Sequence, residues 1–160
     1  MTYGMAPAST DPRTALPAPG WSPRTADYWR AAGQGSLTVP RCSECGTHRW
    51  PPVVVCYRCL STSWRWEPVP GTGRVFTYFW VDQPPHRSLA EHGLYNVTIV
   101  ELDGTQGEPV RLAGWVVGVD KDTLHVDLPV EVTFEPFEGD DEIAVPVWRP
   151  RAAGAGSGNS

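Results

Sequence analysis

The 160-residue chain has little of several features that mark common protein classes. It holds one Lys against twelve Arg, and its longest nearly uncharged apolar runs, VVVCY and LAGWVVGV, are far shorter than the roughly 20 residues that cross a bilayer. The first twenty residues show neither a basic leader nor an apolar segment, so no secretory signal is visible. We therefore expect a cytoplasmic protein without a membrane segment, whose four cysteines stay reduced.

Helical patterns are scarce as well. The chain has 17 Pro, 16 Gly and 8 Trp, which favours turns and strands, and it shows no internal repeat and no heptad pattern. One helix is expected in residues 21–36, where Ser22 can cap the start and Pro23 can occupy the first helical position. Tyr28 and Trp29 then share a face of this helix, which packs either on the body of the protein or on a partner subunit.

Strand patterns dominate the remainder. Two short strands are expected in SLTVPRC and around Trp64 and Trp66. Further along, β-branched or aromatic runs with a period of two occupy five stretches, at 74–81, 94–102, 110–119, 129–137 and 144–150. Five strands in about 75 residues, without a convincing helix between them, predict a small antiparallel barrel.

All four cysteines lie within one stretch of 18 residues with the spacing C-x2-C-x10-C-x2-C: Cys42, Cys45, Cys56 and Cys59. A two-residue gap lets backbone N–H groups of a tight turn point at the first sulfur while the second binds the same ion, so each pair forms a two-ligand knuckle. Gly46 supplies a residue that can take a positive φ after the first pair, and WPPVVV is expected to return the chain as a strand to the second pair. The pattern predicts a zinc ribbon.

Four thiolates fill a tetrahedral site, so the ion is expected to be structural, and His48 is expected at the surface rather than among the ligands. Iron bound by four thiolates has a similar spacing and stays open as an alternative. A dithiol redox pair is disfavoured, because neither pair stands where a strand meets a helix.

Charge is distributed unevenly. Residues 41–65 hold four Arg and one Glu, a balance of +3, whereas residues 101–145 hold twelve acids against Arg111 and Lys121, a balance of −10. Anionic ligands should prefer the first region, and a long nucleic acid would be repelled by the second.

No catalytic constellation is evident. The chain lacks a G-x-S-x-G elbow, and no cysteine is free to act as a nucleophile once a metal holds all four. We therefore assign no catalytic residue. The loop at 82–93 carries His86, Arg87 and His92, and it is either a ligand-binding loop at the barrel mouth or an ordinary solvated connection.

Several stretches together resemble a known family: YWRAAGQGSLTVPRCSECG, WPPVVVCYRC, PGTGRVFTYFWV, LYNVTIVELDG and PVEVTFE. In this order they are similar to acyl-CoA-associated proteins that join a rubredoxin-like zinc ribbon to a C-terminal OB-fold, over about residues 22 to 148. The resemblance implies a mainly β fold with these parts: an N-terminal helix (21–36), a zinc ribbon (37–68) and a five-stranded OB-fold barrel (69–149), between tails at 1–20 and 150–160 that we expect to be disordered. One departure is Asp127, where many members have Gly, which puts the local turn in doubt.

What is known of the family implies a small subunit that accompanies a thiolase-fold enzyme. Such enzymes include acyltransferases, the complex that passes acetoacetyl-CoA to HMG-CoA synthase, and aldolases similar to sterol carrier protein X thiolase that shorten steroid side chains. For acyl-CoA, the arginines near Trp50, Trp64 and Trp66 could stack adenine and bind a phosphate, or these side chains could simply close the seam between ribbon and barrel. The candidate residues for contacts with acyl-CoA or a partner are Tyr28, Trp29, Arg58, Arg65, His86, Arg87 and His92.

Three functions follow as hypotheses. The first is a non-catalytic subunit that binds and stabilises a thiolase-fold enzyme and helps to position acyl-CoA, with a steroid acyl group as one candidate. The second is a nucleic-acid-binding module, because zinc ribbons and OB-folds both serve that role, although the acidic barrel region opposes it. The third is an acyl-CoA enzyme acting alone, with the 82–93 loop supplying an acid or base.

Overall fold

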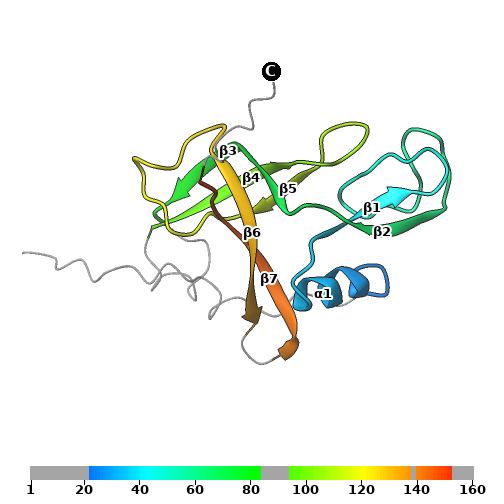
Figure 1. Cartoon of the computed structure of the whole chain (residues 1–160), viewed down its shortest axis with the longest axis horizontal. Coiled ribbons are helices and arrows are strands. Elements are labelled where there is room, and N and C mark those ends of the chain that lie inside the picture. The colour runs from blue at the N-terminus through cyan, green and yellow to red at the C-terminus, as the bar shows by residue number, and fades with distance from the viewer. Residues whose placement is uncertain (1–21, 84–93, 138–139, 153–160) are drawn as a thin grey trace, which may run out of the picture.

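A computed structural model describes residues 22–83, 94–137 and 140–152 (Figure 1). The elements in chain order are α1 (Ala26–Gly33), β1 (Thr38–Cys42), β2 (Trp64–Pro68), β3 (Thr72–Val81), β4 (Tyr95–Leu102), β5 (Arg111–Gly114), β6 (Pro129–Phe137) and β7 (Asp140–Pro150). They form one short helix, a two-stranded sheet β1-β2 and a five-stranded sheet β5-β4-β3-β6-β7. The prediction of a mainly β fold with a helix, a four-cysteine ribbon and a five-stranded barrel is confirmed.

Helix α1 begins later than the sequence pattern predicts. Ser22 does not cap the helix itself but closes the turn before it, where its carbonyl accepts hydrogen bonds from the N–H groups of Thr25 (3.0 Å) and Ala26 (2.9 Å). The inner face of the helix is buried through Tyr28 and Ala32 and packs beside β7 (Figure 1). The aromatic side chains of α1 therefore pack mainly on the body of the protein.

The five-stranded sheet curls until its ends meet. After β5 the chain continues to Val116, which forms a parallel bridge to Trp148 of β7. The side chain of Asn96 on β4 holds this segment from inside, because its Nδ2 donates to the Val116 carbonyl and its Oδ1 accepts from the Val116 N–H, both at 2.8 Å. The run expected at 110–119 is thus a four-residue strand followed by a segment that closes the barrel.

The barrel turns sharply before β6 at Asp127. This residue has φ +66, and its N–H donates to the carbonyl of Val75 on β3 at 2.8 Å. Aspartate is one of the few residues other than glycine that enter the left-handed region readily. The turn that the sequence left in doubt is therefore formed with Asp in place of Gly.

The ribbon lies at the opposite end of the molecule from the segment that joins β5 to β6 (yellow in Figure 1). Strands β1 and β2 pair antiparallel, with Cys42 opposite Trp64. The strand expected at WPPVVV is not formed, since residues 51–55 have no ladder partner. Pro51 and Pro52 lack the N–H groups that a ladder needs, which explains why this prediction was wrong. Instead the segment is an irregular loop leading to the second knuckle.

Candidate functional site

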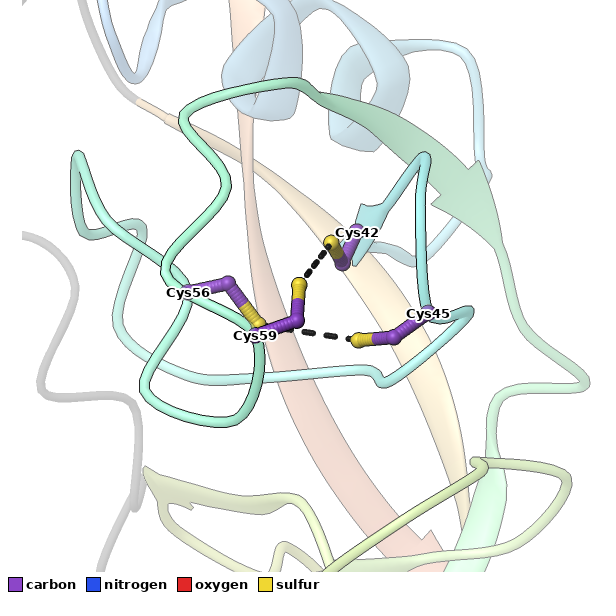
Figure 2. Close-up of side chains that lie close together, drawn as sticks. All are labelled: Cys42, Cys45, Cys56 and Cys59. Atoms are coloured by element: carbon purple, nitrogen blue, oxygen red, sulfur yellow. Dashed lines mark hydrogen bonds between the residues drawn. The ribbon is translucent and has the colours of Figure 1, made fainter.

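The four cysteine sulfurs converge on one point between the two knuckles (Figure 2). All four Sγ atoms lie within 4.8 Å of one another, with Cys42 to Cys59 at 3.5 Å and Cys45 to Cys56 at 3.7 Å. A tetrahedron with metal–sulfur bonds of about 2.3 Å has edges of about 3.8 Å, so the spacing fits a single ion. Because the four thiolates complete the tetrahedron, the site is closed and leaves no position for a substrate.

Three of the four thiols have shifted pKa values, which differ in direction. The hydroxyl and the backbone N–H of Thr47 lower the pKa of Cys45 to about 6, and the N–H of Cys59 lowers the pKa of Cys56 against the effect of desolvation. Although the Ser61 N–H favours its thiolate, desolvation and the neighbouring sulfurs raise the pKa of Cys59 to about 12. Four adjacent thiolates repel one another, and a cation removes that conflict because metals bind the deprotonated form.

The ribbon contains a buried arginine. Arg49 is only 3% exposed, and its Nε and Nη1 atoms have no hydrogen-bond partner among the described residues. Its Nη2 donates to the carbonyl of Val53 at 3.2 Å, and its guanidinium lies 5.8 Å from the ring of Trp64.

The two knuckles have the same backbone turn. In each, the residue after the second cysteine has a positive φ, +72 for Gly46 and +62 for Leu60. Four backbone hydrogen bonds match in pairs: Gly46 N–H to Cys42 O (3.1 Å) with Leu60 N–H to Cys56 O (2.9 Å), and Cys42 N–H to Thr47 O (3.0 Å) with Cys56 N–H to Ser61 O (2.8 Å). The positive φ expected at Gly46 is confirmed, and its equivalent at Leu60 is a residue that the sequence reading missed.

The first knuckle docks on the barrel through His48, which is 3% exposed; the expectation that it lies at the surface was wrong. The ring Nδ1 of His48 accepts a hydrogen bond from the backbone N–H of Gln106 at 2.8 Å. The backbone N–H of His48 donates to the Gln106 carbonyl at 2.9 Å. Gly107 comes equally close, since a Cβ built on it would lie 2.7 Å from Thr47 Cγ2. Sequence patterns could not reveal this contact, because its partners are 58 positions apart and in different modules.

Glu67 on β2 contacts several polar side chains beside the contact between ribbon and barrel. It bonds Arg41 (2.9 Å) and Arg65 (2.7 Å) and lies 3.4 Å from His48 Nε2. The hydrogen bond from Arg41 is the main cause of a lowered pKa of the Glu67 carboxyl. Arg65, a candidate for ligand contact, is therefore already paired with a carboxylate, although its side chain stays largely exposed.

A large apolar cavity of about 800 Å³ opens where the helix, the ribbon and the barrel meet. Its aromatic lining consists of Tyr28, Trp29, Trp50, Trp115 and Trp148. The ring of Tyr28 lies 5.0 Å from that of Trp29 and 5.2 Å from that of Trp50, so these residues form one cluster. Arg24 is the charged side chain among the described lining residues. A cavity of this size and polarity suits the apolar part of a small-molecule ligand.

The other sequence candidates divide into two groups. Arg58 lies on the second knuckle and is exposed, away from the cavity lining. His86, Arg87 and His92 lie outside the described residues. The structure thus brings Tyr28 and Trp29 together at the cavity, and it places Arg58 on a different surface.

Comparison with known proteins gives matches along most of the chain. A family model described as "ChsH2, rubredoxin-like zinc ribbon domain" matches residues 29–65, and one described as "ChsH2, C-terminal OB-fold domain" matches residues 66–135. Among solved structures, a chain of "Ltp2-ChsH2(DUF35) aldolase" superimposes with a TM-score of 0.70 at 32% identity, covering 82% of this chain and 98% of that one.

Curated relatives include a protein of Thermomonospora curvata named "Probable enoyl-CoA hydratase alpha subunit", which is 34% identical over 139 residues. The match covers 87% of this chain but 41% of that protein, so the chain spans about two fifths of its length. A "DUF35 domain-containing scaffold protein" of Methanocaldococcus jannaschii is 28% identical over 106 residues, covering 64% of this chain and 72% of that protein.

Proposed function

Because the chain belongs to the ChsH2 family of zinc-ribbon and OB-fold proteins with DUF35 relatives, we propose that it is a non-catalytic subunit of an acyl-CoA enzyme. In this proposal it binds a thiolase-fold enzyme, stabilises it and helps to position the acyl-CoA, as in aldol cleavage of a steroid side chain or acyl transfer. The observation that carries the proposal is the structural likeness to a chain of the Ltp2-ChsH2(DUF35) aldolase, 98% of which is covered by the match.

The apolar cavity supports the ligand part of the proposal. Its aromatic walls offer stacking faces to a flat or extended apolar group, and Arg24 at its border offers a guanidinium to an anion. Tyr28 and Trp29 are the sequence candidates that such a ligand would touch. The acyl chain of a bulky acyl-CoA is a ligand of this chemistry.

The metal in this proposal is zinc, held by Cys42, Cys45, Cys56 and Cys59. Its part is structural, since the ribbon is too small to bury a core of its own. Residues of the ribbon then hold the helix and the barrel in the orientation that forms the cavity. We place the protein in the cytoplasm, where cysteines remain reduced and available to metal. The described part of the chain has no helix with the length and apolar content to span a membrane.

Nucleic acid is the weaker alternative. An OB-fold that binds a single strand presents a basic groove with stacking aromatics. Here residues 101–145 carry a net charge of −10, which repels a phosphate backbone. A salt-dependent shift of labelled single-stranded DNA would favour that alternative over the subunit role.

The subunit role is tested by mixing the purified chain with a purified thiolase-fold subunit from the same genome. We expect co-elution in size-exclusion chromatography, and acyl-CoA turnover that rises when the two are combined, with no turnover by the chain alone. A chain that remains monomeric and leaves the enzyme's turnover unchanged would contradict the proposal. Replacing Trp29 by Ala at the cavity should raise the KM for acyl-CoA without preventing co-elution.

A further inference from the structure

The second knuckle carries an exposed apolar surface, here called the knuckle patch, made of Val53, Val54, Val55, Tyr57 and Leu60. The first four have 38% to 51% of their surface exposed, and Leu60 has 75%. Single exposed apolar residues are ordinary on protein surfaces. Five within eight consecutive positions are a concentration of exposed apolar surface of the kind that marks interaction sites.

Leu60 is unusual in its backbone as well as its exposure. It has φ +62 in the same turn that Gly46 forms with φ +72, and a bulky residue in this region is an outlier that costs free energy. The Leu60 side chain does little to compensate that cost within the described chain, because it is mostly in solvent. A glycine would form the turn more easily, as the first knuckle demonstrates. The leucine is therefore explained best by a contact outside the chain.

The patch rests on a well-supported base. Arg49, buried beneath the loop, donates to the carbonyl of Val53, and the Cys56 N–H and the Leu60 N–H are both held in the knuckle turn. Cys56 itself is fully buried. A surface that is ordered in advance loses less conformational entropy on binding than a loose loop would.

The charge on the patch points to the kind of partner. Arg58 lies within it and is exposed, and its guanidinium has no ion pair or hydrogen bond to other described residues. Two copies meeting face to face would bring two such cations together, which disfavours a symmetric dimer. Desolvation is the main cause of a raised pKa of Tyr57, and the charge of Glu108, in the segment between β4 and β5, adds to it. A different protein with an apolar surface and a carboxylate facing Arg58 complements the patch.

We infer that the knuckle patch is the surface on which the thiolase-fold subunit of the proposed function docks, with Leu60 and Tyr57 inserted into an apolar recess and Arg58 paired with a partner carboxylate. This inference rests on the proposed function and adds the site of contact. It separates two tasks, since the cavity beside α1 binds ligand and the knuckle patch binds protein.

The test measures the affinity of the purified thiolase-fold subunit for the immobilised full-length chain. Leu60→Gly should weaken binding at least about 10-fold, because an anchor is lost while the turn is kept. Tyr57→Ser should weaken binding by a similar factor, and Arg58→Glu should weaken it by a larger factor. Val126→Thr is the matched control for Val54→Thr, since Val126 is 52% exposed on the barrel and Val54 is 50% exposed in the patch. Only Val54→Thr should reduce the affinity. Metal content and Tm are measured for every variant.

Each outcome is decisive. Wild-type binding that Leu60→Gly, Tyr57→Ser and Val54→Thr leave unchanged would overturn the docking surface while the proposed function stands. Absence of binding by the wild type would overturn the proposed function and the inference with it. A homodimer that Leu60→Gly dissociates would assign the patch to a second copy of this chain instead and would overturn the inference. Selective loss by the patch variants, at unchanged metal content, is the expected result.

Discussion

The two cysteine knuckles of this protein share one backbone turn but have opposite surroundings. After Cys45 the chain enters Gly46 and then two buried residues, Thr47 and His48, which lie against the barrel loop at Gln106. After Cys59 it enters Leu60, which lies in solvent. One small module thus uses one turn to contact its own barrel and leaves the equivalent turn exposed, where we propose that another protein docks.

The neighbours of the two turns explain their different residues. A Cβ at Gly46 would lie 3.3 Å from Arg41 Nη2, inside the polar network around Glu67. At Leu60 the side chain is 75% exposed and meets no such crowding. Glycine at the docked knuckle therefore suits the positive φ and avoids crowding Arg41, whereas the exposed knuckle holds a large side chain at the cost of backbone strain.

Metal removal should destabilise both knuckles. Of the changes considered, it should produce the largest difference between them. Binding of structural zinc contributes on the order of 10 kcal/mol in comparable small modules, so a chelator should disorder the ribbon. We expect the Leu60 amide to lose its hydrogen-exchange protection fully, since its turn has no support from the barrel. The His48 amide, bonded to Gln106, should keep part of its protection.

Hydrogen exchange with mass spectrometry, alongside a metal assay, measures this difference. The double variant Cys42→Ser with Cys59→Ser should reproduce the effect of the chelator. Equal loss of protection at the two amides would show that docking on the barrel gives the first knuckle no stability of its own.

The next largest effect is expected at Gly107, which faces the docked knuckle. Gly107→Ala places a Cβ 2.7 Å from Thr47 Cγ2 at a residue with φ +93, so strain and overpacking should together cost about 2–4 kcal/mol. Gly118→Ala is the matched control, since Gly118 has φ +71 but nothing within 4 Å of an added Cβ. It should cost only about 1–2 kcal/mol. Urea denaturation of both variants gives the comparison; equal losses would mean that the contact with Thr47 is easily relieved.

Much of the fold and the metal site could be predicted from the sequence because their signals are local. The spacing of Cys42, Cys45, Cys56 and Cys59 identifies the cage, and alternating apolar residues identify the strands of the barrel. The prediction of a strand at WPPVVV was wrong. Its valines favour a strand, but its two prolines have no N–H to donate to a neighbouring strand. The family models confirm the resemblance that the quoted stretches suggested.

The seam and the cavity could not be predicted, because they depend on residues brought together from distant positions. His48 meets Gln106 and Glu67 only after ribbon and barrel have folded and docked. Asn96 closes the barrel through Val116 in the same way. A histidine in a cysteine-rich stretch gives no local sign of whether it faces solvent or a second module.

The glycine and the leucine of the two turns should respond in opposite directions to substitution. Gly46→Ala adds a side chain at φ +72 and should destabilise the chain by about 1–2 kcal/mol. Leu60→Gly removes strain at φ +62 and loses little burial, so its effect on the free energy of unfolding should lie within about 1 kcal/mol of zero. Thermal denaturation at saturating metal measures both. A large loss on Leu60→Gly would show that Leu60 packs within its own chain.

The smallest expected effect is the pH dependence that His48 of the docked knuckle contributes. Burial is the main cause of a lowered pKa of His48; Glu67 opposes this shift and the charge of Arg41 reinforces it. An unfolded chain titrates its histidines near about pH 6.5, so it takes up a proton there before the folded chain does. The stability that neutral His48 contributes is therefore present above this pH and is lost as the pH falls through it toward the lower folded-state pKa.

His48→Gln provides the control, because glutamine can still accept from the Gln106 N–H but cannot titrate. Between about pH 7.5 and about pH 5.5 the wild type should lose more stability than this variant, by less than about 1.4 kcal/mol per pH unit. Protonation of the cysteines acts on both proteins alike, so it cancels in the difference. Parallel loss of stability in the two proteins would mean that His48 keeps its ordinary pKa and that the first knuckle docks without needing a neutral ring.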